Sequence, residues 1–212
     1  YKNLPMIREQ VDAILSRASS EENGKIYLDG ELGSFGPEAP LTFQEAIGII
    51  AHKKDTMTAE KEEKMKLIQY IVYDLYHVDH PEWTVTQRFT KLQQLFSGTA
   101  LTNIQLVPSH NVNNEADILR YHQQFVTDGY EGTMIRNPSS QYQLGKRSKG
   151  LQKYKDFEDA EFKIVGFKEG KGNDIGTVIW KCENKSGKTF DVRPTGTREA
   201  RIEQFQQGQS YV

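Results

Sequence analysis

The stretch that most constrains this chain runs from Asp128 to Arg136 and reads DGYEGTMIR. It begins with a dipeptide that is typical of turns and ends in a short apolar run that predicts a buried strand. Between the two stands Glu131, with Gly129 and Gly132 on either side. Because glycine has no side chain, backbone or a phosphate group can approach this carboxylate closely. Glu131 is therefore predicted either to hold a divalent metal ion or to cap a turn.

Length and composition describe one large domain, or one and a half ordinary ones, without a membrane span. Of the 212 residues, 26% are charged and 36% are hydrophobic, and no apolar run reaches the roughly 18 residues that a spanning helix needs. The N-terminal residues lack the apolar core of a signal peptide. The single cysteine, Cys182, cannot form an internal disulfide, which fits a reducing compartment. We therefore expect an intracellular protein, in the cytoplasm or the nucleus, with no membrane partner.

The charge is divided unevenly along the chain. Residues 1–142 carry 13 Lys and Arg against 19 Asp and Glu, a net charge of −6. Residues 143–212 carry 14 against 10, a net charge of +4. A basic end on an acidic body favours a polyanionic partner that binds at that end. Ordinary solvated surface charge is the alternative.

Periodicity and capping signals predict an α+β chain. Helices are expected over residues 5–17, over 42–53, from Thr84 onward and over 114–128, and strands over residues 25–28, 67–75, 104–107, 132–136 and 151–155. The first strand is expected to end in a turn at Asp29-Gly30. The second is rich in β-branched and aromatic residues and is expected to be central. The Lys- and Glu-rich residues 55–66 predict a solvated helix or a mobile loop.

The pattern changes after Asp159. Three short strands are expected at residues 162–167, 177–183 and 189–193, followed by a helix at residues 197–207. Short strands separated by turns at this spacing suggest a small barrel. Three strands and a helix leave such a barrel unfinished.

Three further groups of residues bear on Glu131. Glu31 follows the predicted turn at the end of a strand, so both carboxylates are expected to face one crevice. There they would repel each other unless a metal ion, a sugar hydroxyl or a cation lies between them. Tyr73 offers a flat π surface for a purine base. Lys153 and Lys155, two residues apart on an extended segment, place both ammonium groups on one face, which suits a phosphate.

Together these groups predict a nucleotide with its metal ion. The alternative is that they are polar residues at strand ends beside one core tyrosine.

In their order and spacing, these stretches resemble the ATP-dependent DNA ligases of the covalent nucleotidyltransferase superfamily. Residues 29–32 resemble the third superfamily motif, residues 70–75 the motif that follows it, residues 131–136 motif four and residues 151–155 motif five. Residues 159–167 and 194–198 resemble the ligase OB domain. The resemblance implies an adenylation (nucleotidyltransferase) domain of antiparallel sheets with flanking helices over residues 1–158. It further implies a partial OB-fold β-barrel over residues 159–212.

The resemblance also implies a function. It is that of a monomeric DNA ligase that seals nicks in duplex DNA through lysyl-AMP and DNA-adenylate intermediates, with ATP and Mg²⁺ as cofactors. Glu131 is then the metal contact, and Glu31 reaches the ribose or the metal. Tyr73 stacks on adenine. Lys153 and Lys155 bind the phosphate and help to keep the nucleophilic lysine deprotonated.

The chain departs from the family at one point. The nucleophile of these ligases is a lysine in a Lys-x-Asp-Gly motif, and neither this motif nor the arginine motif after it occurs in the 212 residues. We therefore expect an internal fragment, with an N-terminally incomplete adenylation domain and a C-terminally incomplete OB domain, that forms no AMP adduct by itself. The alternatives are a non-catalytic nucleotide- or DNA-binding relative, an RNA ligase or a capping-type enzyme.

Overall fold

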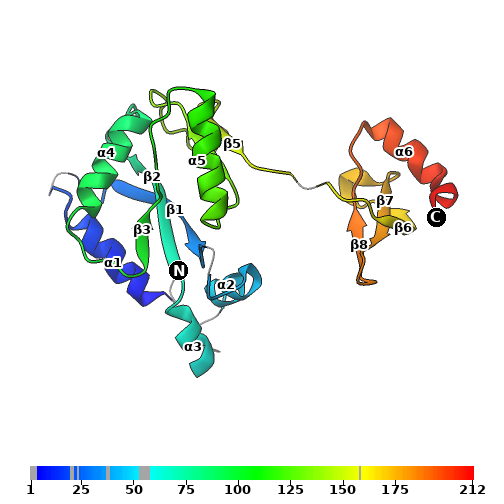
Figure 1. The fold of residues 1–212 in the computed structure, drawn as a ribbon, viewed down its shortest axis with the longest axis horizontal. Coiled ribbons are helices and arrows are strands. Elements are labelled where there is room, and N and C mark those ends of the chain that lie inside the picture. The colour runs from blue at the N-terminus through cyan, green and yellow to red at the C-terminus, as the bar shows by residue number, and fades with distance from the viewer. Residues whose placement is uncertain (1–3, 20–21, 23, 37–38, 53–57, 158) are drawn as a thin grey trace. The chain divides into compact units, whose positions relative to one another are not determined.

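The computed structural model describes residues 4–19, 22, 24–36, 39–52, 58–157 and 159–212. The chain forms two compact units, residues 1–156 and residues 157–212 (Figure 1). The boundary expected from the sequence, after residue 158, lies two residues beyond the observed one. Within the described ranges, no helix combines the length and the apolar character needed to cross a membrane.

The larger unit is built on a three-stranded sheet in the order β1-β2-β3. Strand β1 (Ile26–Gly33) pairs with β2 (Gln69–His77) in antiparallel orientation. Strand β3 (Ile104–Leu106) pairs with the other edge of β2 in parallel orientation, because the chain returns through a helix between these two strands. The central position expected for residues 67–75 is confirmed. The turn expected at Asp29-Gly30 is wrong, because β1 continues through both residues to Gly33.

Helices cover one side of this sheet. Helix α1 (Pro5–Leu15) lies beside α4 (Val85–Phe96), and α4 packs on β2 (Figure 1). The shared core contains Ile14, Val72, Leu75, Leu92 and Leu95, each almost fully buried. Burial of such side chains stabilises the fold by about 1.5–3 kcal/mol each.

The capping signals in the sequence set the helix starts. Thr42 and Glu45 form the expected capping box at α2 (Phe43–Ile50), which contacts β1. Thr84 and Gln87 form another at α4. The charged segment forms helix α3 (Ala59–Met65), which buries no side chain. Residues 55–57 of that prediction lie outside the described residues.

A β-bulge interrupts the alternation of β2. Asp29 pairs with Asp74 and Gly30 pairs with Val72, so Tyr73 is an extra residue on β2. The burial pattern shows the same shift, because Val72 and Leu75 both point into the core although three positions separate them. Tyr73 and Asp74 consequently share the opposite face of the sheet, where the Arg136 side chain contacts both of them.

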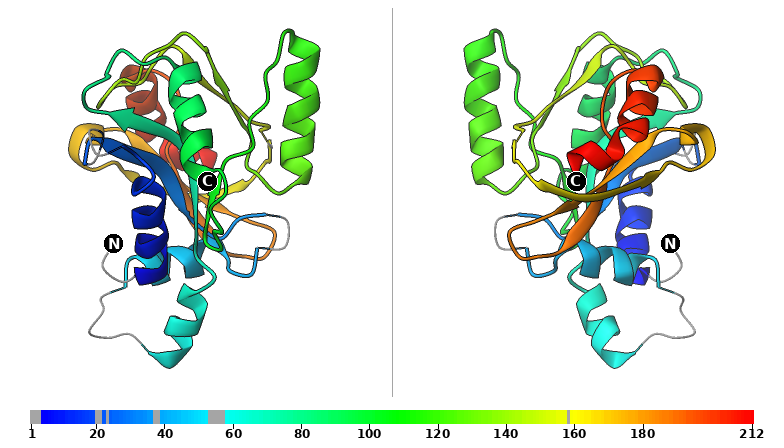
Figure 2. Two further views of the ribbon diagram at one scale, coloured as in Figure 1. Left: turned by 90° about the vertical axis from the view of Figure 1, so that its left-hand side faces the viewer. Right: turned by 90° about the vertical axis from the view of Figure 1, so that its right-hand side faces the viewer.

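A two-stranded antiparallel ribbon completes the larger unit. Strand β4 (Thr133–Arg136) pairs with β5 (Leu151–Tyr154). Helix α5 (Glu115–Thr127) contacts β4 beside this ribbon (Figures 1 and 2). The buried strand expected at residues 132–136 is only half-buried, and its Met134 side chain is exposed.

The smaller unit contains the expected three strands and helix. Strands β6 (Lys163–Glu169), β7 (Val178–Glu183) and β8 (Thr189–Val192) form an antiparallel sheet in that order. Helix α6 (Arg198–Gln206) packs on β7. The core is small and consists of Val178, Trp180 and Cys182 with a few partly buried neighbours. The α+β class, with antiparallel sheets and flanking helices, is thus confirmed for the whole chain.

Candidate functional site

Glu131 binds both predicted lysines. Its Oε2 accepts a hydrogen bond from Lys153 Nζ at 3.1 Å, and its Oε1 accepts one from Lys155 Nζ at 3.0 Å. The spacing by two on an extended segment does bring both ammonium groups to one side of the ribbon, as predicted. We call these three residues the lysine cluster.

Two glycines fix the place of Glu131. Helix α5 ends in a Schellman motif: Gly129 has φ +87° and donates to Val126 O, and Tyr130 N donates to Phe125 O. Gly132 allows a close approach, because an added Cβ would lie 2.5 Å from Tyr154 O and 2.8 Å from Lys155 Cβ. The predicted role of glycine beside this carboxylate is therefore confirmed for Gly132, where the approaching group is backbone.

The lysine cluster is open to solvent. The Glu131 side chain is 70% exposed, and hydrogen bonds from Lys155 and Lys153 hold its pKa below the usual range. Exposed ion pairs add little to stability, because water solvates the separated charges well. Both lysines can therefore release the Glu131 carboxylate and bind a phosphate group with little loss of stability.

Glu131 also fits a hard metal ion. Each of its oxygens accepts one lysine hydrogen bond and keeps a further lone pair on its exposed side. Mg²⁺ needs only one or two protein carboxylates when water and phosphate oxygens supply the rest. Within the described residues no group of three or more His, Cys, Asp or Glu is arranged as a metal site. Glu131 therefore suits a metal ion whose remaining ligands are water and phosphate oxygens.

Tyr73 lies among acidic groups on the sheet face opposite the core. Burial, followed by the carboxylate of Asp29, raises the pKa of Tyr73 to about 12, and Glu31 adds to the effect. Asp29 also accepts a hydrogen bond of 2.6 Å from the Tyr142 hydroxyl. The Glu31 carboxylate is therefore close enough to Tyr73 for its negative charge to raise the pKa of the tyrosine hydroxyl.

Asp74, the residue after Tyr73, belongs to a largely buried charge cluster that sequence reasoning missed. Asp74 accepts hydrogen bonds from Arg88 Nε at 2.7 Å and Arg88 Nη2 at 3.0 Å, and it forms an ion pair with Arg136. We call these three residues the arginine cluster. Asp74 and Arg136 stand inside the motif-like stretches at residues 70–75 and 131–136, so a signal for them existed. Nothing local in the sequence distinguishes Arg88, which lies in a helix of ordinary amphipathic pattern.

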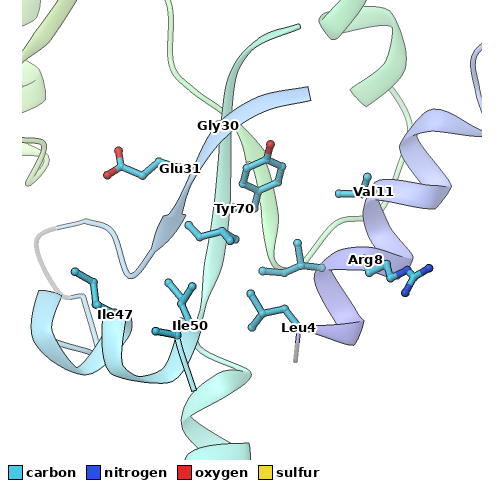
Figure 3. Close-up of a pocket in the computed structure, with 11 residues that line it drawn as sticks. Leu4, Arg8, Val11, Gly30, Glu31, Ile47, Ile50 and Tyr70 are labelled. Atoms are coloured by element: carbon cyan, nitrogen blue, oxygen red, sulfur yellow. The ribbon is translucent and has the colours of Figure 1, made fainter. Parts of the chain in front are cut away.

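Glu31 lines a hollow of about 820 Å³ between α1, α2 and β1 (Figure 3). Its walls are mostly apolar side chains, including Leu4 and Ile50, and Tyr70 stands at its back. Among the described residues that line it, none belongs to the lysine cluster. One crevice shared by Glu31 and Glu131 stays a prediction.

A second hollow, of about 730 Å³, lies within the loop that joins β4 to β5. Its lining is polar and includes the three cations Arg136, Arg147 and Lys149 together with serine and glutamine side chains. This lining suits a phosphate-bearing ligand.

Comparison with solved structures identifies the fold as one that DNA ligases share. One match is a structure from a structure–function analysis of Lig E DNA ligases, with a TM-score of 0.66 and 22% identity over 83% of this chain and 64% of that one. Another is the Chlorella virus DNA ligase-adenylate, with a TM-score of 0.53 and 20% identity over 99% of this chain and 72% of that one.

Comparison of sequences identifies the family. The model of the ATP dependent DNA ligase domain matches residues 2–155. The DNA ligase of African swine fever virus is 33% identical over 175 residues, which are 80% of this chain and 39% of the viral protein. DNA ligase 2 of Haloquadratum walsbyi is 28% identical over 187 residues, 84% of this chain and 29% of that protein. The chain belongs to the ATP-dependent DNA ligase family and spans well under half the length of these relatives.

Proposed function

We propose that this chain belongs to an enzyme that seals nicks in duplex DNA with ATP, and that it supplies the nucleotide-binding surface. The observation that carries the proposal is the lysine cluster, in which two cations from β5 and its end meet at one exposed carboxylate before β4. The cluster lies within the residues that match the ligase domain.

In the proposed reaction a lysine attacks the α-phosphate of ATP and releases pyrophosphate. The AMP then passes to the 5′-phosphate of the nick, and the 3′-hydroxyl displaces it to form the new phosphodiester bond. Lys153 and Lys155 hold the phosphate oxygens and lower the pKa of the attacking lysine by their positive charge. Tyr73 stacks on adenine, and Glu31 reaches the ribose or the metal. Glu131 would hold Mg²⁺, which would neutralise phosphate charge.

The experiment is to incubate the 212-residue chain with Mg²⁺ and labelled ATP. Equilibrium dialysis measures reversible binding, and denaturing electrophoresis detects a covalent adduct. We expect reversible binding without a labelled band, because attack needs a lysine aimed in line at the α-phosphate. In the proposal, Lys153 and Lys155 bind the phosphate oxygens of ATP instead. Absence of reversible binding would overturn the proposed nucleotide site.

A labelled band would instead show that the nucleophile lies within residues 1–212. Mapping the labelled lysine would then identify it and would revise the roles given to Lys153 and Lys155.

DNA is the proposed polyanionic partner. Residues 143–212 carry a net charge of +4, and the cation-lined hollow of the β4–β5 loop lies at the start of this region. Binding to phosphates releases counterions, so the affinity for nicked duplex should fall steeply as salt increases and should depend little on sequence. Fluorescence anisotropy over a range of salt concentrations measures this, and an affinity that does not change with salt would contradict the proposal.

A further inference from the structure

The Asp74 carboxylate, on the residue after Tyr73, binds several donors at once. Besides its two cations, its Oδ1 accepts a hydrogen bond from the Leu75 backbone N–H at 2.8 Å. The side chain is only 9% exposed. Because so many donors bind this buried carboxylate, it keeps one orientation. The side chains that bind it are therefore held in place as well.

Arg88 anchors the arginine cluster to the larger unit. It donates to both oxygens of Asp74, and its Nη1 donates to Trp83 O at 2.6 Å and to Ser140 O at 3.3 Å. The Arg88 side chain therefore joins α4, β2 and the loop after β4 through hydrogen bonds. Its planar fork allows these bonds to form at once.

Arg136 is held less firmly and reaches further. Its Nη1 binds Asp74, and within the described residues no other hydrogen bond holds its guanidinium. The same guanidinium lies 5.7 Å from the centroid of the Tyr73 ring. This distance is within the range of a cation–π contact. Arg136 is thus the group through which the buried cluster touches the aromatic ring.

We propose that the arginine cluster positions the Tyr73 ring for stacking on a purine base, with Arg136 as the contact to the ring and with Asp74 and Arg88 acting through it. This inference rests on the proposed function. The β-bulge makes the arrangement possible, because only an extra residue in β2 places Tyr73 and Asp74 on one face. A freely rotating ring would lose conformational entropy on stacking, whereas a ring already in place does not.

The first test compares ligand affinities. The dissociation constants of ATP and of inorganic tripolyphosphate are measured by calorimetry for the wild-type chain, Arg136→Met and Arg136→Lys. We expect Arg136→Met to weaken ATP binding by about tenfold and tripolyphosphate binding much less, because both ligands meet the charge of Arg136 in the β4–β5 hollow but only ATP uses the ring. Arg136→Lys should fall in between, because a single ammonium group keeps the charge but cannot serve Asp74 and the ring together.

The matched control is Arg120→Met. Arg120 also lies over a tyrosine ring, 4.3 Å from the centroid of Tyr121, and also binds an aspartate, Asp117. It belongs to α5 and to none of the clusters above. This variant should bind ATP as the wild type does.

A double-mutant cycle separates positioning from direct contact. In the Tyr73→Ala background, Arg136→Met should have no further effect on the ATP dissociation constant, because the ring through which it acts is gone. If the full loss recurs in that background, Arg136 contacts the nucleotide itself and the inference is overturned.

A measurement without nucleotide keeps the inference independent of the proposed function. All ten tyrosines are replaced by 3-fluorotyrosine, and the Tyr73 signal is assigned by Tyr73→Phe in fluorine NMR. We expect the Tyr73 signal to shift and broaden in Arg136→Met and to stay unchanged in Arg120→Met. An unchanged signal in Arg136→Met would overturn the inference, whereas a wild-type chain that does not bind ATP would overturn the proposed function.

Discussion

The lysine cluster and the arginine cluster each join one carboxylate to two cations, and they differ in almost everything else. The Glu131, Lys153 and Lys155 side chains are 70%, 50% and 36% exposed. Those of Asp74 and Arg88 are 9% and 4% exposed. Ammonium groups in water exchange partners readily, whereas the buried Arg88 guanidinium is held by several hydrogen bonds. In the proposed function, the exchangeable charge of the lysine cluster serves phosphate binding and the fixed charge of the arginine cluster supports the Tyr73 ring.

The largest expected effect comes from the buried carboxylate. Asp74→Asn should lower the free energy of unfolding by roughly 3–5 kcal/mol, because it leaves Arg88 buried without its counter-charge. Glu131→Gln is the matched change in the exposed cluster and should leave this free energy unchanged. Urea titration followed by circular dichroism measures both. Similar losses in the two variants would remove the distinction between the clusters.

Glu131→Ala should instead abolish AMP transfer in an intact ligase that contains this chain. Because the side chain is exposed, the fold should remain. Nick sealing within about twofold of the wild type at limiting Mg²⁺ would be evidence against a metal role for Glu131.

Tyr73, which contacts Arg136 of the arginine cluster, should show the next largest effect. Tyr73→Ala should raise the ATP dissociation constant about tenfold or more, because stacking needs the ring. Tyr73→Phe should be mild, with a small loss because the hydroxyl interacts with Asp29. Calorimetry distinguishes these outcomes, and a Phe variant as weak as the Ala variant would exclude stacking as the main contribution.

Gly132 tests how closely β5 must approach Glu131. Gly132→Ala should cost about 1–3 kcal/mol of unfolding free energy, because the new methyl group collides with the Tyr154 carbonyl. Gly48→Ala in helix α2 is the control: apart from its own helix backbone and chain neighbours, no atom of the described residues lies within 4 Å of its added Cβ, and the helix should gain about 0.5–1 kcal/mol. Equal effects of the two substitutions would contradict the close approach.

The smallest expected effect concerns His77, a buried group outside both clusters. Burial, followed by the neighbouring His80, lowers the pKa of His77. Its contribution to stability is full above the unfolded pKa of about 6.5 and is lost as the pH falls toward the lower folded pKa. Glu22, whose pKa falls to about 2 through its bond to Lys91, keeps its full contribution above about pH 4.5 and loses it only as the pH falls below that value. Urea midpoints between about pH 7.5 and pH 5 should therefore decline in the wild type and be flatter in His77→Gln.

Local signals predicted most elements because each depends on neighbours in the sequence. The capping boxes at Thr42 and Thr84 and the spacing of Lys153 and Lys155 are of this kind. The β-bulge at Tyr73 could not be predicted, because it depends on register with β1. Strand β1 runs through Asp29-Gly30 for a related reason: pairing with β2 outweighs the turn preference of the dipeptide.

The pairing of Asp74 with its two arginines was equally out of reach, although Asp74 and Arg136 both stand in motif-like stretches. Arg88 lies on a helix that the sequence identifies only by its apolar face, and Arg136 lies 62 residues from Asp74. Such long-range ion pairs leave no periodic pattern, so the arginine cluster became visible only in the folded chain.

The central claim is that the lysine cluster binds phosphate, and its most direct test is the affinity for inorganic tripolyphosphate. The double variant Lys153→Ala/Lys155→Ala is compared by calorimetry with Lys64→Ala/Lys66→Ala, which removes two other exposed lysines that form ion pairs. We predict that the first double variant binds at least about tenfold more weakly than the wild type and that the second binds equally well. Equal affinity in all three chains would contradict the account.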